Sequence, residues 1–180
     1  MSNISLKKMQ NIYLVGFMGS GKSTIGKKLS KKLNLKFLDT DKIIEKKNSM
    51  TINQIFYNQG EKFFRNEEKR LLIVLNKYKK TIISTGGGFV CNSRIIDLIN
   101  KNNFTIYLKY ESEILYKRLL KEKQNRPLLK NLKENELKEF IENLLFSREK
   151  YYKKSKVIID CKDINDNEIL REIYSTISVR

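Results

Sequence analysis

Short runs of apolar residues alternate along the chain with longer stretches in which apolar residues recur every three or four positions. The short runs predict buried strands, and the longer stretches predict helices packed on a sheet. Strands are predicted over residues 11–15, 36–39, 81–85, 104–109 and 156–160. Helices are predicted over residues 21–33, 93–100, 111–122, 133–154 and 166–177, with a broken pair over 41–78.

This alternation is typical of βαβ units, so it predicts an α/β fold with a parallel sheet between helices. No linker, repeat or low-complexity segment divides the 180 residues, and we expect one domain over residues 1–180. Residues 1–10 are an N-terminal extension without a long apolar stretch or cleavage site, so we do not expect a secretory signal. No apolar run approaches the roughly 18 residues of a membrane-spanning helix, so no membrane association is expected.

The charge of the chain is strongly positive, at 37 − 20 = +17, and it comes from 29 Lys and only 8 Arg. The chain also holds 22 Ile and 18 Asn but no Ala. Lys, Asn and Ile have AT-rich codons, so an AT-biased genome accounts for much of the lysine excess. We therefore expect a solvated lysine surface and no specific nucleic-acid partner. A basic nucleic-acid-binding protein is the alternative that the charge alone leaves open.

Histidine and cysteine usage limits the chemistry further. The chain has no His, so no imidazole can act as a base or a metal ligand. Cys91 and Cys161 lie far apart without a CxxC pair, which excludes a disulfide scaffold and a Cys-rich zinc site. This cysteine usage suits a reducing cytoplasm, where we expect the protein to be.

The strongest motif is GFMGSGKST at residues 16–24, which matches GxxxxGK[ST] between a predicted strand and a predicted helix. Backbone N–H groups of such a loop point at phosphate oxygens, and the helix that follows adds its positive N-terminal end. Lys22 would bridge the β- and γ-phosphates, and the Ser23 hydroxyl would bind Mg²⁺. A glycine-rich turn is the structural alternative, and the motif does not identify the phosphoryl acceptor.

Two carboxylates, Asp39 and Asp41, follow the second predicted strand, at the edge where open α/β sheets bind ligands. Asp39 could hold Mg²⁺ through water, and Asp41 could accept a hydrogen bond from a substrate hydroxyl. A helix N-cap or turn is the structural alternative.

In GEKFFR, Arg65 offers a planar guanidinium that can bind a carboxylate bidentately, and an intrahelical pair with Glu68 is the structural alternative.

Two later motifs add backbone and arginine donors. Three glycines at 86–88 follow the third predicted strand and would let a ligand touch backbone N–H groups, with a flexible turn as the alternative. Arg126 lies in RPLL, within a polar stretch at 121–135 that we interpret as a mobile lid closing over the phosphates. Arg148 follows on a predicted helix, with Tyr152 four residues later.

Together GFMGSGKSTIG, LDTD, GEKFFRNEE, STGGG, RPLL and the Arg148-x-x-x-Tyr152 pair resemble the shikimate kinase family. The matches run in order from Gly16 to about Asn165. The resemblance implies the nucleoside-monophosphate-kinase-like branch of P-loop kinases, with five parallel strands in the order 2-3-1-4-5 and a lid. It also implies Mg²⁺-dependent transfer of the ATP γ-phosphoryl to the 3-hydroxyl of shikimate, in aromatic amino-acid biosynthesis. We expect a monomer.

The resemblance also implies residue roles. Residues implied to bind ATP are Gly19, Ser20, Gly21, Lys22, Ser23, Thr24, Arg118, Arg126 and Asn165. Residues implied to bind shikimate are Asp41, Arg65, Gly87, Gly88 and Arg148. Lys22, Asp41 and Arg126 are the expected catalytic residues, and Mg²⁺ would bind Ser23 directly and Asp39 through water. Arg118 stands eight residues before Arg126 where many relatives have seven, and Asn165 is a positional match only.

Two other interpretations of the phosphate-loop motif stay open at this point. One is another small-molecule kinase of the same branch, such as a gluconate or nucleotide kinase, although paired arginines favour a carboxylated acceptor. The other is a catalytically silent ATP-binding relative, which intact Lys22, Asp41 and Arg126 argue against.

Overall fold

Five parallel strands form the centre of the structure, a computed structural model that describes residues 11–177. The strands are β1 (Asn11–Val15), β2 (Lys36–Asp39), β3 (Thr81–Ser84), β4 (Phe104–Lys109) and β5 (Val157–Asp160). Their order is β2-β3-β1-β4-β5, and all four neighbouring pairs are parallel, as predicted. The predicted N-terminal extension at 1–10 lies outside the described residues.

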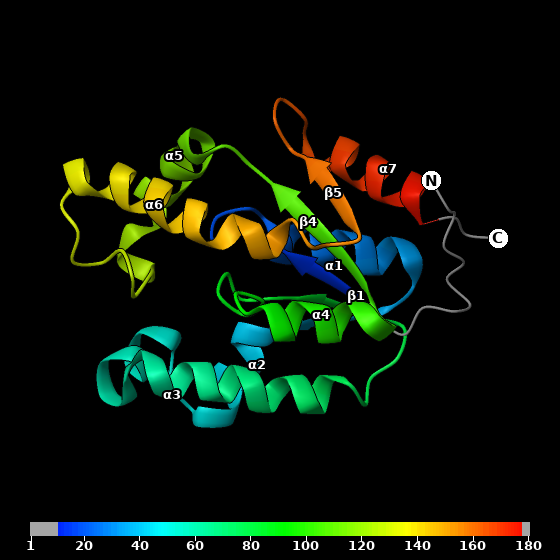
Figure 1. Cartoon of the computed structure of the whole chain (residues 1–180), viewed down its shortest axis with the longest axis horizontal. Helices are drawn as coiled ribbons and strands as arrows, with labels where there is room; N and C mark the ends of the chain where they lie inside the picture. The colour runs from blue at the N-terminus through cyan, green and yellow to red at the C-terminus, as the bar shows by residue number, and fades with distance from the viewer. Residues whose placement is uncertain (1–10, 178–180) are drawn as a thin grey trace.

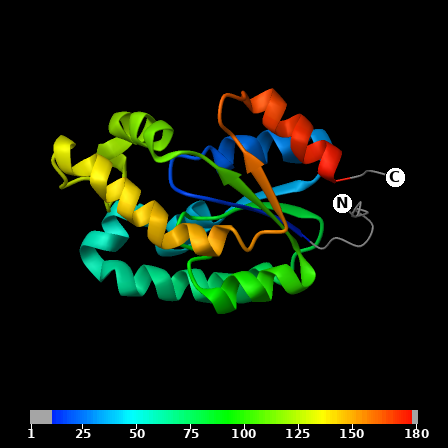
Figure 2. The ribbon, with the colours of Figure 1, turned by 45° about the horizontal axis from the view of Figure 1, so that its top comes forward.

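Helices cover both faces of this sheet (Figures 1 and 2). Helices α1 and α7 lie on one face, and α3 and α4 lie on the other, which confirms the three-layer arrangement. Helix α5 lies beyond the end of the sheet to which the β4 arrow points, and α6 runs beside α5 and then back toward β4, where Tyr152 packs on Tyr107. The helices are α1 (Lys22–Leu33), α2 (Thr40–Asn48), α3 (Ile52–Leu75), α4 (Ser93–Asn102), α5 (Ser112–Glu122), the short 3₁₀ helix η2 (Lys123–Asn125), α6 (Glu134–Tyr152) and α7 (Asp166–Thr176).

The core is centred on β1, whose five residues are all buried because the strand is flanked by β3 and β4 and covered on both faces. Its neighbours β3 and β4 are almost as fully buried, whereas the edge strands β2 and β5 are partly exposed. Burial on both faces explains why the central strands are continuous apolar runs rather than alternating ones.

None of the helices within residues 11–177 combines the length and apolar character needed to cross a membrane.

Strands β1, β2 and β4 have the predicted bounds, and the ends of the other elements differ from the predicted ones by at most three residues. Strand β5 starts at Val157 rather than at Lys156, because the Lys156 N–H donates to the side-chain hydroxyl of Thr105 in β4 instead of to a backbone carbonyl of that strand. The predicted broken pair over 41–78 is α2 followed by α3. Besides the break between α2 and α3, this region has a second break inside α3 at Gly60, whose φ of 78° and ψ of 167° are not helical.

Candidate active site

The loop of residues 16–24 joins β1 to α1 at the carboxyl end of the sheet. Gly19 and Gly21 have φ values of 78° and 77°, the left-handed region that favours glycine. Gly21 is also the N-cap of α1 and provides no side-chain acceptor. The first N–H groups of α1 therefore have no side-chain cap, and together with the positive end of the helix they form an anion site.

Lys22 is held against this loop in a buried position. Its Nζ donates to the carbonyl oxygen of Phe17 at 2.6 Å and to the Ser20 hydroxyl at 3.2 Å. Burial lowers the pKa of Lys22 to about 8, and the nearby Asp41 carboxylate opposes that shift. Both acceptors are neutral, so the ammonium carries a charge that an anion in the loop would balance.

Asp39 and Asp41 have different surroundings although they are two residues apart. Asp39 Oδ1 accepts from the backbone N–H groups of Asp41 and Lys42, so the helix-cap alternative holds for Asp39. Asp39 Oδ2 accepts from the Ser23 hydroxyl at 2.5 Å, which puts both predicted metal-binding residues together. Asp41 Oδ1 is buried and has no hydrogen-bond partner within residues 11–177. Burial raises the pKa of Asp41 to about 6.

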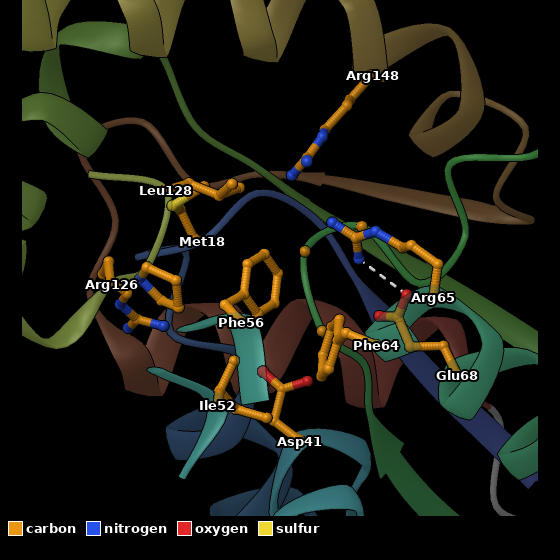
Figure 3. A pocket seen from close by; sticks show the side chains of 14 residues that line it. Met18, Asp41, Ile52, Phe56, Phe64, Arg65, Glu68, Arg126, Leu128 and Arg148 are labelled. Atoms are coloured by element: carbon orange, nitrogen blue, oxygen red, sulfur yellow. Dashed lines mark hydrogen bonds and ion pairs between the residues drawn. The ribbon is translucent and has the colours of Figure 1, made fainter. Parts of the chain in front are cut away.

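Asp41 lies in an open cavity that we call the acceptor pocket (Figure 3). The pocket combines an apolar wall, five charged side chains and the three loop glycines. It is lined by Met18, Asp41, Ile52, Phe56, Phe64, Arg65, Glu68, Gly86, Gly87, Gly88, Arg126, Pro127, Leu128 and Arg148. A second cavity, around the phosphate loop, also includes Lys22, Ser23 and Thr24 and shares Asp41 and Arg126 with the acceptor pocket. A group bound at Asp41 would therefore lie next to a phosphate in the loop.

Three arginines reach the acceptor pocket from different segments (Figure 3). Arg65 of α3 pairs with Glu61 at 2.7 Å and Glu68 at 2.8 Å, so the intrahelical pairing holds, and yet its guanidinium lines the pocket. Arg126 follows η2 and pairs with Glu122 at 2.6 Å.

Arg148 of α6 differs from the other two arginines of the pocket. It is only 8% exposed, and it has no carboxylate within 4 Å among residues 11–177. Burying a guanidinium without a direct ion pair is costly, and a bound anion would relieve that cost.

The three loop glycines are required for space. Positive φ values occur at Gly16, Gly19, Gly21 and Gly60 but not at 86–88, so the loop does not need glycine for its backbone conformation. A Cβ on Gly86 would lie 2.5 Å from Asp41 Oδ1, and a Cβ on Gly88 would lie 2.7 Å from Arg65 Cζ. A side chain at 86 or 88 would displace charged groups of the pocket, and one at 87 would lie 3.1 Å from the Met18 backbone nitrogen, which explains the motif better than a flexible turn does.

Two residues predicted on the adenine side lie outside the acceptor pocket. The guanidinium of Arg118 packs over the Tyr110 ring at 4.3 Å, and its Nη1 donates to the Gly19 carbonyl at 3.2 Å. Asn165 is the N-cap of α7, and its side chain accepts from the N–H groups of Asn167 and Glu168. Arg118 is thus beside the phosphate loop and Asn165 at a helix end, and their contacts with adenine remain predictions.

Glu68 lines the acceptor pocket although the motifs did not predict it there. Its Oε1 is buried without a partner within residues 11–177, and burial raises the pKa of Glu68 to about 7 although Arg65 is paired with it. Its position three residues after Arg65 was a usable signal, since a residue one turn away on a helix shares a face. The apolar wall, including Phe56 and Phe64, was also missed, because an aromatic residue in a helix is more often part of the core.

A phosphate loop that shares a carboxylate and an arginine with a separate small pocket is the arrangement of a P-loop kinase that acts on a small molecule. The shikimate kinase family model matches residues 18–178, and the chain belongs to this family. It is 44% identical to a shikimate kinase of Flavobacterium psychrophilum over 92% of this chain and 98% of that one. It is 40% identical to a shikimate kinase of Azobacteroides pseudotrichonymphae over 94% of this chain and 100% of that one.

A solved structure supports the same assignment. The shikimate kinase from Acinetobacter baumannii in complex with shikimate superposes with a TM-score of 0.85 at 31% identity. The match covers 93% of this chain and 92% of that one. The predicted family and fold are therefore confirmed.

Proposed function

We propose that the protein transfers the γ-phosphoryl group of ATP to the 3-hydroxyl of shikimate, giving shikimate 3-phosphate and ADP. The observation that carries the proposal is Arg148, a buried cation that forms no ion pair within residues 11–177 and lines the same pocket as Asp41 and Arg65. Such a pocket suits a small molecule with a carboxylate at one end and hydroxyls at the other. Family membership and the shikimate complex of the Acinetobacter enzyme support this acceptor.

The carboxylate of shikimate would lie between Arg65 and Arg148, next to the N–H groups of Gly87 and Gly88. Its ring would contact the apolar wall, and the reacting hydroxyl would meet Asp41. Asp41 would orient that hydroxyl and accept its proton, since the Asp41 carboxylate has a free, buried oxygen. Lys22 and Arg126 would neutralise charge on the transferring phosphoryl group, which is the main requirement of this reaction.

Mg²⁺ fits the oxygen atoms available at the phosphate loop. Ser23, Asp39 and Asp41 line one cavity with the loop, and hydroxyl and carboxylate oxygens are the ligands that Mg²⁺ takes. No group of three acidic, cysteine or histidine side chains within residues 11–177 is arranged to hold a metal alone. Mg²⁺ would therefore enter with ATP, held by Ser23 and, through water, by Asp39, and it would supply charge neutralisation at the phosphates.

The other acceptors considered for this site fit it less well. Paired arginines suit the carboxylate of gluconate and the phosphate of a nucleotide as well as the carboxylate of shikimate, and membership of the shikimate kinase family favours shikimate over both. A silent ATP-binding protein is disfavoured because Lys22, Asp41 and Arg126 all line the cavities. We also propose that the enzyme acts as a monomer in the cytoplasm, where ATP is available and the free thiols of Cys91 and Cys161 would persist.

ADP release measured by a coupled assay with shikimate, quinate, gluconate and nucleoside monophosphates tests the proposed acceptor. We expect ADP release that depends on shikimate and is at least about 100-fold slower with the other acceptors, because they misplace the carboxylate or the hydroxyl. Asp41→Asn should lower kcat with shikimate by about 100-fold or more while ATP binding is retained. Rapid turnover by this variant would remove Asp41 from the catalytic residues.

A further inference from the structure

The glycine loop at 86–88 directs its backbone groups in two different ways. All three carbonyl oxygens accept hydrogen bonds from the protein: Gly86 from the Phe89 N–H, Gly88 from the Cys91 N–H, and Gly87 from side chains. The N–H groups of Gly87 and Gly88 donate to no acceptor within residues 11–177. The loop therefore presents two free donors at a place where both glycines line the acceptor pocket.

The carbonyl of Gly87 is held from α6, the helix that also carries Arg148. The Tyr152 hydroxyl donates to this oxygen at 2.5 Å, and Cys91 Sγ, a weaker donor, approaches it at 3.5 Å. Tyr152 is fully buried and does not line the pocket, whereas Arg148, one turn earlier on the helix, does (Figure 3). Helix α6 thus supplies the Arg148 guanidinium to the pocket and the Tyr152 hydroxyl, which holds the glycine loop by a hydrogen bond.

The planarity of the peptide bond makes that support specific. No peptide bond within residues 11–177 is cis, so the Gly87 C=O and the Gly88 N–H point in opposite directions. Fixing the carbonyl toward Tyr152 therefore fixes the Gly88 N–H away from it. Without side chains of their own, the glycines have few other contacts that could hold this peptide in one orientation.

We propose that Tyr152 is a positioning residue for the acceptor, whose hydroxyl aims the Gly88 N–H at the substrate carboxylate held by Arg65 and Arg148. This inference rests on the proposed function. Burial keeps the Tyr152 hydroxyl protonated by raising its pKa, so it stays a donor throughout the working pH range. The other two fully buried tyrosines, Tyr13 and Tyr107, have hydroxyls without partners within residues 11–177. Buried tyrosine hydroxyls in this core therefore do not always form hydrogen bonds, so the bond from Tyr152 to Gly87 is specific to this position.

Tyr152→Phe tests the proposal, with Tyr107→Phe as the matched control. The two rings are neighbours, with centroids 5.2 Å apart, and both are buried, but the Tyr107 hydroxyl does not touch the loop. We expect Tyr152→Phe to raise KM for shikimate by about 3- to 10-fold, the effect of one neutral hydrogen bond, with KM for ATP within about twofold. Tyr107→Phe should leave both values unchanged. An unchanged KM for shikimate in Tyr152→Phe, or equal rises for both substrates, would overturn the proposal.

A measurement without substrate separates this inference from the proposed function. In protein labelled with ¹⁵N-glycine, the Gly88 amide shares its peptide with the Gly87 carbonyl, so its ¹⁵N shift reports the hydrogen bond to that carbonyl. We expect the Gly88 signal to move in Tyr152→Phe but not in Tyr107→Phe, and p-aminophenylalanine at position 152, which keeps a donor, to restore it. An unmoved Gly88 signal contradicts the positioning role even if the wild type turns over shikimate. If the wild type shows no turnover of shikimate, the proposed function fails instead.

Discussion

Asp41 and Arg148 are two of the pocket residues with incomplete charge pairing or hydrogen bonding. Asp41 has a buried carboxylate oxygen without a partner within the part of the chain described, and Arg148 forms no ion pair there. Both arrangements cost stability in the free protein. A substrate with hydroxyls at one end and a carboxylate at the other would satisfy both residues at once, so the binding site and the instability have one origin.

Asp41→Asn should therefore stabilise the free enzyme at alkaline pH while it removes activity. The pKa of Asp41 is raised from 3.8 to about 6, so the folded state holds a proton that the unfolded state releases between these values. Stability that is present below pH 4 is lost as pH rises through 6, by on the order of 3 kcal/mol. We expect the variant to melt about 6–12 °C higher than wild type at pH 8, with the difference shrinking toward pH 4. A difference independent of pH would show that the Asp41 charge is not its cause.

Arg65→Lys and Arg148→Lys test the carboxylate site. Lysine keeps the positive charge but loses the planar fork, so each variant should raise KM for shikimate by about 10-fold or more and change KM for ATP little. Arg70→Lys is the control, because Arg70 is an exposed arginine of α3 that pairs with Glu67 outside the pocket. Equal losses of affinity for both substrates in Arg65→Lys would indicate that Arg65 supports the fold through Glu61 and Glu68.

At the scale of elements, the strands and the phosphate loop could be predicted because their signals are local. Each central strand is a short apolar run, and the loop glycines stand at fixed spacing before Lys22. The lack of space for side chains at 86–88 could not be predicted from the sequence, because Asp41 and Arg65, which crowd this loop, come from α2 and α3. The bond from Tyr152 to Gly87 joins residues 65 positions apart, and no local pattern reports it.

The kink inside α3 at Gly60 was not predicted, because the helical sequence pattern runs through this residue. Gly60 separates the turn that carries Phe56 from the turn that carries Phe64 and Arg65, so it sets how both reach the pocket. Its φ and ψ lie in a region open essentially to glycine alone.

Gly60→Ala should lower the free energy of unfolding by about 1–3 kcal/mol. A Cβ at this position meets nothing within 4 Å, so the loss would come from the backbone conformation and not from a clash. KM for shikimate should rise more than KM for ATP, because the phosphate loop lies on a different element. Denaturant unfolding and kinetics measure the two effects. Asn58→Ala, an exposed change two residues away, should alter neither, and full stability in Gly60→Ala would exclude strain at the kink.

At the scale of the whole molecule, the +17 charge and the active site are largely separate features. Most of the charge is lysine, and many lysines form exposed ion pairs, which contribute little to stability. Arg65, Arg126 and Arg148 are three of only 8 arginines, and all three line the acceptor pocket. The excess charge would still favour the approach of two anionic substrates.

The acceptor pocket uses residues from Met18 to Arg148, so it forms only when segments far apart in the sequence are brought together. The motifs predicted Asp41, Arg65, Gly87, Gly88, Arg126 and Arg148, and the fold brings these six residues together in one cavity. The central proposal is that shikimate occupies this cavity as the phosphoryl acceptor.

Product analysis by ³¹P NMR after incubation of the full chain with Mg²⁺, ATP and shikimate tests that claim most directly. We predict one phosphomonoester signal that correlates with the proton on C3 of shikimate and accumulates in equal amount to ADP. ADP that accumulates with inorganic phosphate alone, or a phosphoryl group on a different hydroxyl, would contradict the claim.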